Sequence, residues 1–415
     1  MRILILTQYF WPENFRVNDL ASDLIARGHQ VTILTGLPNY PSGTVFEEYR
    51  KDPAKFTQFE GAEVIRIPML PRGSGSMRLM MNYASFVVSG LTVGAWKLRG
   101  RKFDSIFVFM ISPITAVLPA ILQRWLKRAP LFVWILDLWP ETLEAVGVVK
   151  SPRLLALVGK LVRYIYRRTD HILVQSHAFM DSVRAYAGPD AAISYFPGWA
   201  EPIFQRGLES SPPAPEVLQF SDSFNVLFAG NMGEAQDFPA ILEAAEALAK
   251  DIPLRILVVG DGRMTAWVQK EITRRGLSNR VVLLGRFPLE RMPSFFKAAD
   301  ALLVSLKRDK IFAMTIPGKV QSYLAAGVPL LGMLDGEGGR VITEARAGLV
   351  SPSGDGAALA RNIEVLAAMT PAERAIMGAN AQAYGINEFD RTRLLSGLES
   401  KMQDAVNRKY PGGAI

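Results

Sequence analysis

A short Pro-Gly turn near residue 317 precedes an apolar segment and places a lysine where an anion could bind. Lys319 directly follows Pro317-Gly318, and Gly327 ends the segment just before the next apolar run. The pattern predicts a helix whose N-terminus carries free backbone N–H groups and a partial positive charge, which suit a phosphate. Lys319 adds a full charge, so the segment is a candidate site for a nucleotide diphosphate. An ordinary connection between a helix and a strand, with a surface lysine, fits the same pattern.

Three glycine turns follow predicted strands in the same half of the chain. They are Gly230–Gly233, Gly260–Gly262 and Gly285–Pro288, and each comes directly after an apolar run. Glycine lets the backbone approach a phosphate or a sugar closely, although any one such turn is common in α/β proteins. If the strands are parallel, the three turns and the Lys319 helix meet at one edge of a sheet. Their convergence predicts a nucleotide site.

Three polar loops follow predicted strands in the N-terminal half. They are Trp11–Asn14, Leu37–Gly43 and Ile135–Thr142. In a parallel sheet these loops lie at the carboxyl ends of the strands, where ligands bind in α/β proteins. The N-terminal half therefore has its own candidate ligand edge.

Asp137 is the most unusual residue in these loops, because it lies in apolar surroundings. It follows an apolar run and precedes Leu138 and Trp139. A carboxylate in such surroundings must be hydrogen-bonded or have a function. We interpret Asp137 as functional because Trp139 and Glu141 share its loop. The alternative is a capping aspartate before a helix that begins near Glu141.

The composition excludes several kinds of site. The chain has 415 residues, which is enough for two domains of ordinary size. It has no cysteine and three histidines, so thiolate chemistry and disulfides are excluded and a histidine zinc site is disfavoured. No segment resembles a DxD-type metal site. We therefore expect an activity that needs no metal and no cofactor.

The positive charge is concentrated in the N-terminal half. The net charge is +8; residues 1–200 contain 23 Lys/Arg and 15 Asp/Glu, and the remaining residues contain 24 of each. Basic surfaces attract membranes, nucleic acids and anionic substrates. No basic-aromatic pattern typical of nucleic-acid binding is present. The charge therefore favours an anionic membrane surface or a lipid diphosphate.

One segment of the basic half is apolar enough to contact a membrane. Residues 79–96 carry no charge, and Lys97, Arg99, Arg101 and Lys102 follow them. Eighteen uncharged residues are near the lower limit for a membrane span, and this segment also contains polar residues and two glycines. We interpret it as a helix that is buried or lies in the membrane interface.

The order of the predicted elements indicates two α/β domains. Apolar runs alternate with helical patterns in both halves, which is typical of doubly wound parallel sheets. The segment Ser194–Phe204 contains two prolines and a glycine and is interpreted as a linker. We expect Rossmann-like domains over residues 1–197 and 205–390, with a cleft between them that faces the carboxyl ends of both sheets. A polar and apolar pattern over residues 391–407 predicts a C-terminal helix.

These motifs occur in an order that resembles a known enzyme family. The chain is similar to the retaining, nucleotide-sugar-dependent glycosyltransferases of family 4, which have the GT-B fold. Within that family it resembles bacterial O-antigen and capsule enzymes typified by N-acetyl-L-fucosamine transferases. The motifs span nearly the whole chain and are Tyr9–Glu13, Arg27–His29, Pro38–Gly43, Asp137–Glu141, Gly230-Asn231, Gly260–Gly262, Pro317–Lys319 and Ala326-Gly327.

The resemblance implies a division of labour between the two domains. The C-terminal domain would bind the donor nucleotide, and the N-terminal domain would bind the acceptor. Asp137 matches the position where many members place a histidine or aspartate near the donor sugar, and Glu13 would line the cleft. We expect Asp137, Lys319 and Glu13 to be catalytic. The C-terminal helix would cross back onto the N-terminal domain, as in similar proteins.

The resemblance also assigns binding residues. Backbone at Arg286–Pro288 would face the base, and Gly230-Asn231 would hold the diphosphate together with the Lys319 helix. The expected donor-binding residues are Gly230, Asn231, Gly233, Gly260, Gly262, Arg286, Phe287, Pro288, Thr315, Ile316, Pro317, Gly318 and Ser322. The expected acceptor-binding residues are Asn14, Asn39, Tyr40, Trp139 and Glu141.

The sequence departs from the family pattern at one place. Many members carry two glutamates eight positions apart, the second just before the Ala-x-Gly turn. Aligned on Ala326-Gly327, these positions are Met314 and Ser322, and neither is acidic. The sugar-hydroxyl and ribose contacts of those glutamates must therefore come from elsewhere or be absent.

The expected function is transfer of a sugar to a lipid-linked saccharide. The resemblance implies a nucleoside-diphosphate donor, with UDP expected, that carries an N-acetylated deoxyhexosamine or hexosamine. The expected acceptor is an undecaprenyl-diphosphate-linked saccharide in O-antigen, capsule or exopolysaccharide biosynthesis. The expected location is cytoplasmic, with peripheral binding to the surface of the inner membrane and no nucleic-acid partner.

Two other functions fit parts of the pattern. A non-hydrolysing nucleotide-sugar 2-epimerase would share the fold, but it needs a cluster of acidic residues and histidines that three histidines poorly supply. A non-catalytic nucleotide-sugar-binding protein of a polysaccharide assembly complex is kept open by the two missing glutamates. Retention of Asp137, Glu141 and Lys319 argues against it.

Overall fold

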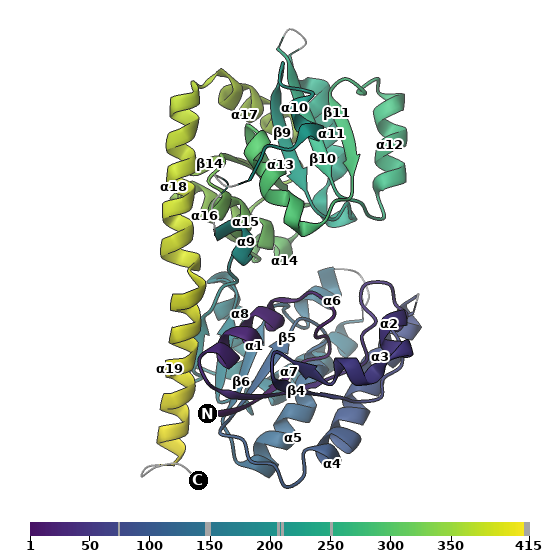
Figure 1. The fold of residues 1–415 in the computed structure, drawn as a ribbon, viewed down its shortest axis with the longest axis vertical. Coiled ribbons are helices and arrows are strands. Elements are labelled where there is room, and N and C mark those ends of the chain that lie inside the picture. Colours follow the sequence, from purple (N-terminus) through teal and green to yellow (C-terminus); the bar gives the residue numbers. More distant parts are fainter. Residues whose placement is uncertain (74, 146–150, 206–207, 209–210, 250–251, 411–415) are drawn as a thin grey trace. The chain divides into compact units, whose positions relative to one another are not determined.

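The chain forms two compact α/β units (Figure 1). The first unit contains Met1–Phe196 and Thr392–Ile415, and the second contains Pro197–Arg391. The computed structural model describes residues 1–73, 75–145, 151–205, 208, 211–249 and 252–410. Each unit has its own sheet and its own buried apolar core.

The sheet of the first unit has eight strands within the described residues, in the order β3-β4-β2-β1-β5-β6-β7-β8. Neighbouring strands pair in parallel except β3, which is antiparallel to β4. The central strands are almost entirely apolar because helices bury both faces of a parallel sheet. The strands are β1 (Arg2–Leu6), β2 (Gln30–Thr35), β3 (Gln58–Phe59), β4 (Ala62–Arg66), β5 (Ser105–Met110), β6 (Leu131–Ile135), β7 (His171–Val174) and β8 (Ile193–Tyr195).

Helices connect these strands and pack apolar faces against them. In α1, the buried residues Val17, Leu20, Ala21 and Leu24 recur every three or four positions, as one face of a helix requires. The helices of the first unit are α1 (Arg16–Ala26), α2 (Glu47–Lys51), η1 (Pro53–Phe56), α3 (Ser76–Ser89), η2 (Gly90–Gly94), α4 (Ala95–Lys97), η3 (Ile114–Val117), α5 (Leu118–Lys127), α6 (Glu141–Ala145), α7 (Pro152–Tyr166), α8 (Ala178–Ala187) and α19 (Arg391–Lys409).

The apolar segment after β4 forms one long helix of 22 residues, Ser76–Lys97, with a π-helical stretch at η2. Among the described residues it is the one helix long and apolar enough to cross a membrane by length and composition, with a mean hydropathy of 1.2. One face is buried through Asn82, Phe86 and Ser89. The opposite face is exposed, so the helix is amphipathic rather than uniformly buried.

The C-terminal helix α19 belongs to the first unit. Glu399 accepts hydrogen bonds from Arg27 at 3.1 Å and lies 2.9 Å from Nε2 of His29. The other ring nitrogen of His29 lies 3.1 Å from the N-terminal amino group of Met1. The Arg27-Gly-His29 motif therefore fastens α19 to the start of the sheet.

The sheet of the second unit has six parallel strands within the described residues, in the order β11-β10-β9-β12-β13-β14. Apolar side chains of β9, β10 and β12 pack with those of α11 and α17 in one core. The strands are β9 (Phe224–Ala229), β10 (Leu254–Val259), β11 (Val281–Gly285), β12 (Ala301–Ser305), β13 (Leu330–Met333) and β14 (Gly348–Ser351).

The helices of the second unit either connect its successive parallel strands, as this topology requires, or lie before β9 or after β14. They are α9 (Pro202–Gln205), α10 (Pro215–Leu218), η4 (Glu234–Gln236), α11 (Phe238–Ala247), α12 (Thr265–Arg274), η5 (Leu289–Arg291), α13 (Met292–Ala298), α14 (Lys310–Ala313), α15 (Gly318–Ala326), α16 (Gly336–Glu344), α17 (Gly356–Ala368) and α18 (Pro371–Phe389).

The boundary between the two units, at Phe196 and Pro197, falls inside the predicted linker Ser194–Phe204, but both ends of that segment are regular structure. Its first residues, Ser194 and Tyr195, belong to strand β8, which pairs with β7, and its last residues form helix α9. Phe196 accepts a hydrogen bond at 2.9 Å from the indole N–H of Trp134. Pro197 and Gly198 lie between these two elements, whereas Pro202 is the first residue of α9. The sequence did not predict β8, because three residues are too few to show a periodic pattern.

Candidate functional site

The three glycine turns of the second unit meet at the carboxyl ends of neighbouring strands. The N–H of Gly230 donates to the carbonyl of Val259 at 2.8 Å, and the N–H of Gly260 donates to that of Gly285 at 2.8 Å. The N–H of Met232 donates to the carbonyl of Asp261 at 2.7 Å. The turns after β9, β10 and β11 thus form one continuous backbone surface, as the parallel order of the strands predicts.

Two of these glycines cannot be replaced without strain. Gly260 has φ of 143°, and a Cβ atom there would lie 1.9 Å from the carbonyl oxygen of Gly230. Gly230 has φ of 132°, and a Cβ atom there would lie 2.8 Å from Cε of Lys319. Positive φ and close contact both require glycine. The turn after β9 therefore comes into direct contact with the lysine of α15.

Lys319 lies in the first turn of α15, and its charged end points into the protein. The residue is half-buried, but its Nζ is fully buried and makes no hydrogen bond within the described residues. Nζ lies 3.4 Å from the centre of the Phe228 ring. Burial lowers the pKa of Lys319 to about 7, because water no longer solvates the ammonium. An ammonium left without a partner at a helix N-terminus is a site that an anion would complete.

Ser322, one turn after Lys319, has a carboxylate as its partner. Its hydroxyl donates to Oε2 of Glu201 at 2.6 Å, and it also lies 3.3 Å from the carbonyl of Gly318. Ser322 occupies the second position at which many family members have a glutamate. Glu201, from the segment just before α9, thus brings a carboxylate to that position.

The other expected donor-binding residues flank this surface. Asn231 is exposed, and the N–H of Gly233 is bonded to Oε1 of Gln236 at 3.0 Å. Arg286 is 76% exposed and lies 3.9 Å from Asp261. The hydroxyl of Thr315 donates a hydrogen bond to the carbonyl of Ile311 at 2.9 Å. The hydroxyl is therefore engaged within the protein, and Thr315 lies shortly before the start of α15. Phe287 and Pro288 directly follow Arg286 in the chain, and Ile316, Pro317 and Gly318 lead from Thr315 into α15.

In the first unit, Glu13 is a buried carboxylate whose partners are all backbone amides. Oε1 accepts hydrogen bonds from the N–H groups of Asn39 at 2.8 Å and Tyr40 at 2.7 Å. Oε2 accepts from the N–H of Phe10 at 3.1 Å. Burial raises the pKa of Glu13 to about 7, and the three amides oppose this rise. Glu13 ties the loop after β1 to the loop after β2.

The neighbouring acceptor candidates differ in how much surface they offer. Asn39 is fully buried; its amide donates to Leu37 and its oxygen accepts from Arg72, so it supports the loop. Tyr40 is 38% exposed and packs against Tyr9 with ring centres 5.5 Å apart and ring planes tilted by 50°. Asn14 is exposed. Tyr40 and Asn14 are therefore the members of this group that can reach a ligand.

Asp137 is held by its own loop. Its Oδ1 accepts from the hydroxyl of Thr142 at 2.5 Å, and its Oδ2 accepts from the indole N–H of Trp139 at 3.3 Å. Burial raises the pKa of Asp137, whereas hydrogen bonds with Thr142, Trp139 and Ser112 lower it. The carboxylate is thus half-buried and oriented, because side chains of its own loop hold both of its oxygens.

Glu141 combines one satisfied and one unsatisfied oxygen. Its Oε1 accepts from the hydroxyl of Ser182, whereas its Oε2 is buried without a hydrogen-bond partner in the described part of the chain. The hydroxyl of Tyr166 is also buried and unpartnered. Burial raises the pKa of that tyrosine, and the charges of Glu141 and Asp137 raise it further.

Sequence reasoning missed the partners of these carboxylates. Thr142, Ser112 and Ser182 are small hydroxyl residues with no distinctive local pattern, and two of them are far from Asp137 and Glu141 in sequence. Glu201 was missed as well, because it lies 121 residues from Ser322. Its proximity to Ser322 could be found only from the fold.

No group of three or more histidine or acidic side chains is placed to hold a metal ion within the residues that the structure describes.

Two family models match the two halves of the chain. The model described as Glycosyl transferase 4-like domain matches residues 14–199, and the model described as Glycosyl transferases group 1 matches residues 223–369. Together they cover most of the chain.

Relatives and solved structures agree with these matches. WcaI of Escherichia coli K12, named as a glycosyl transferase of colanic acid biosynthesis, is 26% identical over 79% of this chain and 82% of its own. The 2-deoxystreptamine N-acetyl-D-glucosaminyltransferase of Streptomyces fradiae is 28% identical over 87% of each chain. The crystal structure of Anabaena HepE in complex with UDP matches with a TM-score of 0.68 and 15% identity, over 97% of this chain and 100% of that one. From the two matched domains and the two parallel α/β units, we conclude that the chain belongs to the family 4 glycosyltransferases with the GT-B fold.

Proposed function

We propose that the protein transfers an N-acetylated hexosamine or deoxyhexosamine, with retention, from a UDP-sugar to a lipid-linked saccharide of a cell-surface polysaccharide. The observation that carries the proposal is the buried, unpartnered Nζ of Lys319 beside the glycine turn at Gly230. A diphosphate is the donor group that satisfies this ammonium and the free N–H groups of α15 together.

In this proposal Lys319 stabilises the leaving group. As the bond between the sugar C1 and the diphosphate oxygen breaks, negative charge grows on the diphosphate. Lys319 and the N-terminus of α15 are already fixed where that charge develops, which is the arrangement that lowers a barrier most. The leaving diphosphate helps to take the proton of the attacking acceptor hydroxyl. No protein nucleophile is required, and we propose that no metal ion is required.

The rest of the donor site is assigned to the same unit. The backbone at Arg286–Pro288 contacts the base, and Gly230-Asn231 contacts the diphosphate. Glu201 accepts a hydrogen bond from a ribose hydroxyl, in place of the glutamate that Ser322 replaces. HepE, whose structure holds UDP, supports a uridine nucleotide, and the Streptomyces relative supports a hexosamine.

The acceptor is assigned to the first unit. Asp137 has a raised pKa and an orientation fixed by Thr142, and Trp139 lies next to it. We propose that Asp137 binds hydroxyl groups of the sugar undergoing transfer, while Tyr40, Asn14, Trp139 and Glu141 bind the acceptor saccharide. Glu13 contributes by fixing the loop that carries Tyr40.

We also propose that the first unit lies on the cytoplasmic face of the inner membrane. The exposed face of the helix Ser76–Lys97 carries Met77, Met80 and Val88, which are 69%, 61% and 62% exposed. Basic residues follow the helix, and anionic lipids attract such residues. A prenyl diphosphate acceptor would be presented at that surface.

The first experiment offers the purified protein a panel of UDP-, GDP- and dTDP-sugars with a synthetic prenyl-diphosphate saccharide in neutral detergent. We expect mass spectrometry of the lipid product to show one added hexosamine or deoxyhexosamine from one UDP-sugar. A GDP- or dTDP-linked donor would overturn the assignment of the base. Failure to bind any nucleotide in calorimetry would overturn the assignment of Lys319.

A further inference from the structure

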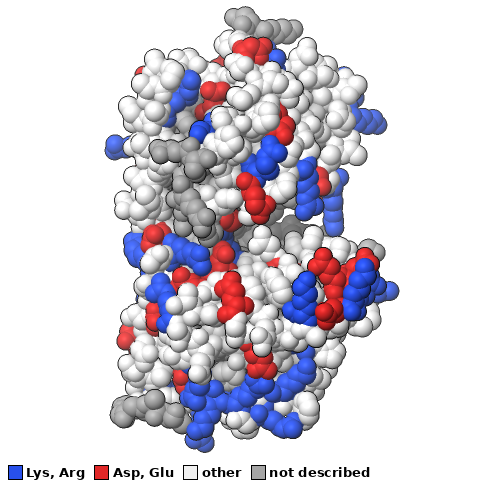
Figure 2. All heavy atoms as spheres, in the orientation of Figure 1, with Lys and Arg blue, Asp and Glu red and all other residues white. Residues whose placement is uncertain are grey.

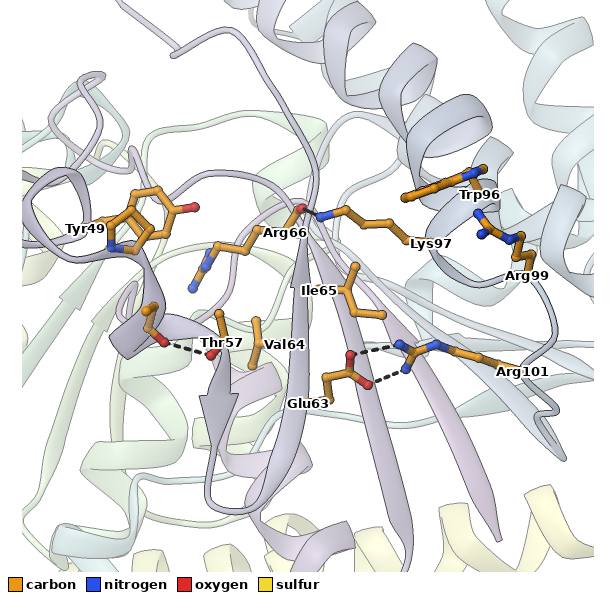
Figure 3. Close-up of a pocket in the computed structure, with 12 residues that line it drawn as sticks. Tyr49, Thr57, Glu63, Val64, Ile65, Arg66, Trp96, Lys97, Arg99 and Arg101 are labelled. Carbon is orange, nitrogen blue, oxygen red and sulfur yellow. Dashed lines mark hydrogen bonds and ion pairs between the residues drawn. The ribbon is translucent and has the colours of Figure 1, made fainter.

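The first unit contains a cavity that the proposed transfer reaction does not use. This pocket, of about 600 Å³, lies between strand β4, the α2–η1 segment and the end of the long helix Ser76–Lys97. Figure 3 shows Arg66 and Tyr49 on one side of β4 and Lys97, Arg99 and Arg101 on the other. The pocket has the charge and the surroundings of a site for a phosphate at a surface.

Four cations and one carboxylate line this pocket. The carboxylate, Glu63, is paired with Arg101 through two hydrogen bonds. Lys97 donates to the backbone carbonyl of Arg66 at 3.0 Å, and Arg99 lies over the ring of Trp96 at 4.3 Å. Arg66 interacts electrostatically with the carboxylate of Glu13. Within the described residues, Lys97 and Arg99 have no carboxylate partner, so a bound anion would be their first.

Arg66 forms the floor of the pocket and is almost fully buried, with 9% exposure. Its guanidinium donates to the backbone carbonyls of Gly36, at 2.9 Å, and Trp11. Its Nε is buried and has no hydrogen-bond partner in the described residues. Burial lowers the pKa of Arg66 to about 10, which still leaves it charged at neutral pH. Arg66 thus adds a buried positive charge to the lining of the pocket, on the side of β4 opposite Lys97 and Arg99.

The rim of the pocket is apolar and exposed. Trp96 is 62% exposed on α4, and α5, which contacts α4, exposes 74% of Trp125 and 47% of Leu126. Exposed tryptophans bordered by lysine and arginine are typical of side chains at a membrane interface. A pocket for a soluble anion would have no need of this apolar rim.

The surroundings carry almost no negative charge. Residues 64–136 contain ten Lys/Arg and one acidic residue, Asp104, which is paired with Arg2 at 2.5 Å. Figure 2 shows Lys and Arg side chains gathered at the end of the first unit where α4 and α5 lie in Figure 1. The electrostatic attraction to an anionic bilayer is therefore strongest beside the pocket.

We propose that this pocket binds the phosphate of an anionic glycerophospholipid, such as phosphatidylglycerol, while Trp96 and the exposed face of the helix Ser76–Lys97 enter the interface. The inference rests on the proposed membrane location and adds a specific headgroup site to it. Arg99 and Lys97 contact the phosphate. The pocket fixes which way the first unit faces the bilayer.

Vesicle flotation with the full-length protein tests the site without donor or acceptor. The wild-type protein is compared on phosphatidylcholine vesicles with and without about one-third phosphatidylglycerol. The test variant is Lys97→Gln/Arg99→Gln. The matched control is Lys102→Gln/Arg128→Gln, which removes two charges from the same basic region outside the pocket. Salt is kept constant, because it screens both effects.

We expect the wild type to favour phosphatidylglycerol by at least tenfold. Both variants lose the diffuse attraction of two charges to the bilayer. The pocket variant should lose on the order of tenfold more affinity for these vesicles than the control, because it also loses its hydrogen bonds to the phosphate. Equal loss in both variants would assign the attraction to diffuse charge, and no lipid preference in the wild type would also overturn the site.

Two further measurements separate this inference from the alternatives. Saturable binding of inorganic phosphate without vesicles, abolished in the pocket variant, would assign the pocket to a soluble anion and overturn the lipid. Calorimetry with UDP tests the donor site on the second unit independently. If UDP binds but the vesicles do not discriminate, this inference fails and the proposed transferase stands. If the vesicles discriminate but UDP does not bind, the lipid site stands and the proposed donor site fails.

Discussion

Glu13 in the first unit and Lys319 in the second are both buried ionisable groups at the carboxyl edge of a parallel sheet, but their surroundings differ. Three backbone amides donate to Glu13. Nothing in the described residues accepts from Nζ of Lys319, which faces an aromatic ring and a glycine. Both have a pKa of about 7, shifted in opposite directions by burial.

The difference indicates that Glu13 stabilises loops of the protein, whereas Lys319 is suited to bind a ligand. A buried charge whose hydrogen bonds are all made within the fold rigidifies its surroundings. A buried charge without partners destabilises the ligand-free protein, and a bound ligand of opposite charge offsets that cost. On this reading the two loops that Glu13 joins are completed by the fold, and the nucleotide surface of the second unit is completed by the donor.

Replacing Lys319 should have the largest effect on activity. We expect Lys319→Ala to reduce transfer by about 100- to 1,000-fold, as removal of other fixed groups that stabilise developing negative charge does. Steady-state kinetics with the identified donor measures the change. Lys310→Ala, an exposed lysine nearby in the chain, is the control and should retain near-normal turnover. Near-normal turnover of Lys319→Ala itself would remove Lys319 from the mechanism.

The same residue should limit the stability of the ligand-free protein. Because its pKa falls from 10.5 unfolded to about 7 folded, the unfolded state binds more protons between these values, and stability rises with pH across that window. Lys319→Met keeps an apolar stem against Phe228 and removes the charge. We expect a higher Tm than wild type at pH 7 and a difference that disappears above about pH 10.5. A lower Tm for Lys319→Met at pH 7 would mean that the ammonium stabilises the fold.

The parts of the site that the sequence predicted depend on local pattern and strand order. A glycine pair after an apolar run predicts a turn at a strand end, and parallel pairing then brings such turns together. Gly230, Gly260 and Gly285 meet for this reason. Pro317 directly precedes α15, and proline is common where helices begin, so the start of this helix could be predicted from the sequence.

The parts that the sequence could not predict depend on contacts between distant segments. The inward direction of the Lys319 side chain depends on the space beside Phe228, which the packing of β9 against α15 creates. The hydrogen bonds that Oε1 of Glu13 accepts come from backbone amides of a loop 26 and 27 residues away in the chain. Strand β8 was missed because Ile193–Tyr195 is too short to show a period.

The affinity for UDP should depend on pH through Lys319. Above pH 7 the ammonium is mostly deprotonated in the free protein, and a bound diphosphate raises its pKa, so binding takes up a proton. We expect the affinity to fall as pH rises above about 7, by up to about tenfold per pH unit. Calorimetry at pH 8 in two buffers of different ionisation enthalpy measures the proton uptake. Uptake that persists in Lys319→Ala would assign the effect to another group.

Replacing Glu13 should affect stability more than chemistry. In Glu13→Gln, one carboxylate oxygen becomes an amide NH2 that cannot accept the N–H groups now bound there. We expect a loss of about 1–3 kcal/mol in the free energy of unfolding, measured by urea denaturation. Glu47→Gln, whose side chain is 69% exposed, is the control and should change stability little. If Glu13→Gln were as stable as wild type but had lost its turnover, Glu13 would act on the substrate instead of on the loop.

The smallest effect concerns Glu201, whose carboxylate lies where the family pattern places a glutamate. Glu201→Gln keeps an oxygen for the Ser322 hydroxyl, so the fold should be preserved, while the charge that would accept from a ribose hydroxyl is lost. We expect UDP to bind about five- to tenfold more weakly, since a hydrogen bond to a charged group contributes roughly 1–1.5 kcal/mol. Calorimetry with 2′-deoxy-UDP and 3′-deoxy-UDP gives the decisive comparison. If Glu201 contacts a ribose hydroxyl, the wild type discriminates against one of these ligands and the variant does not, because removing either partner removes the same bond. Equal discrimination in both proteins would show that the carboxylate at Ser322 belongs to the fold, and that the second unit, like the first, satisfies its carboxylate internally.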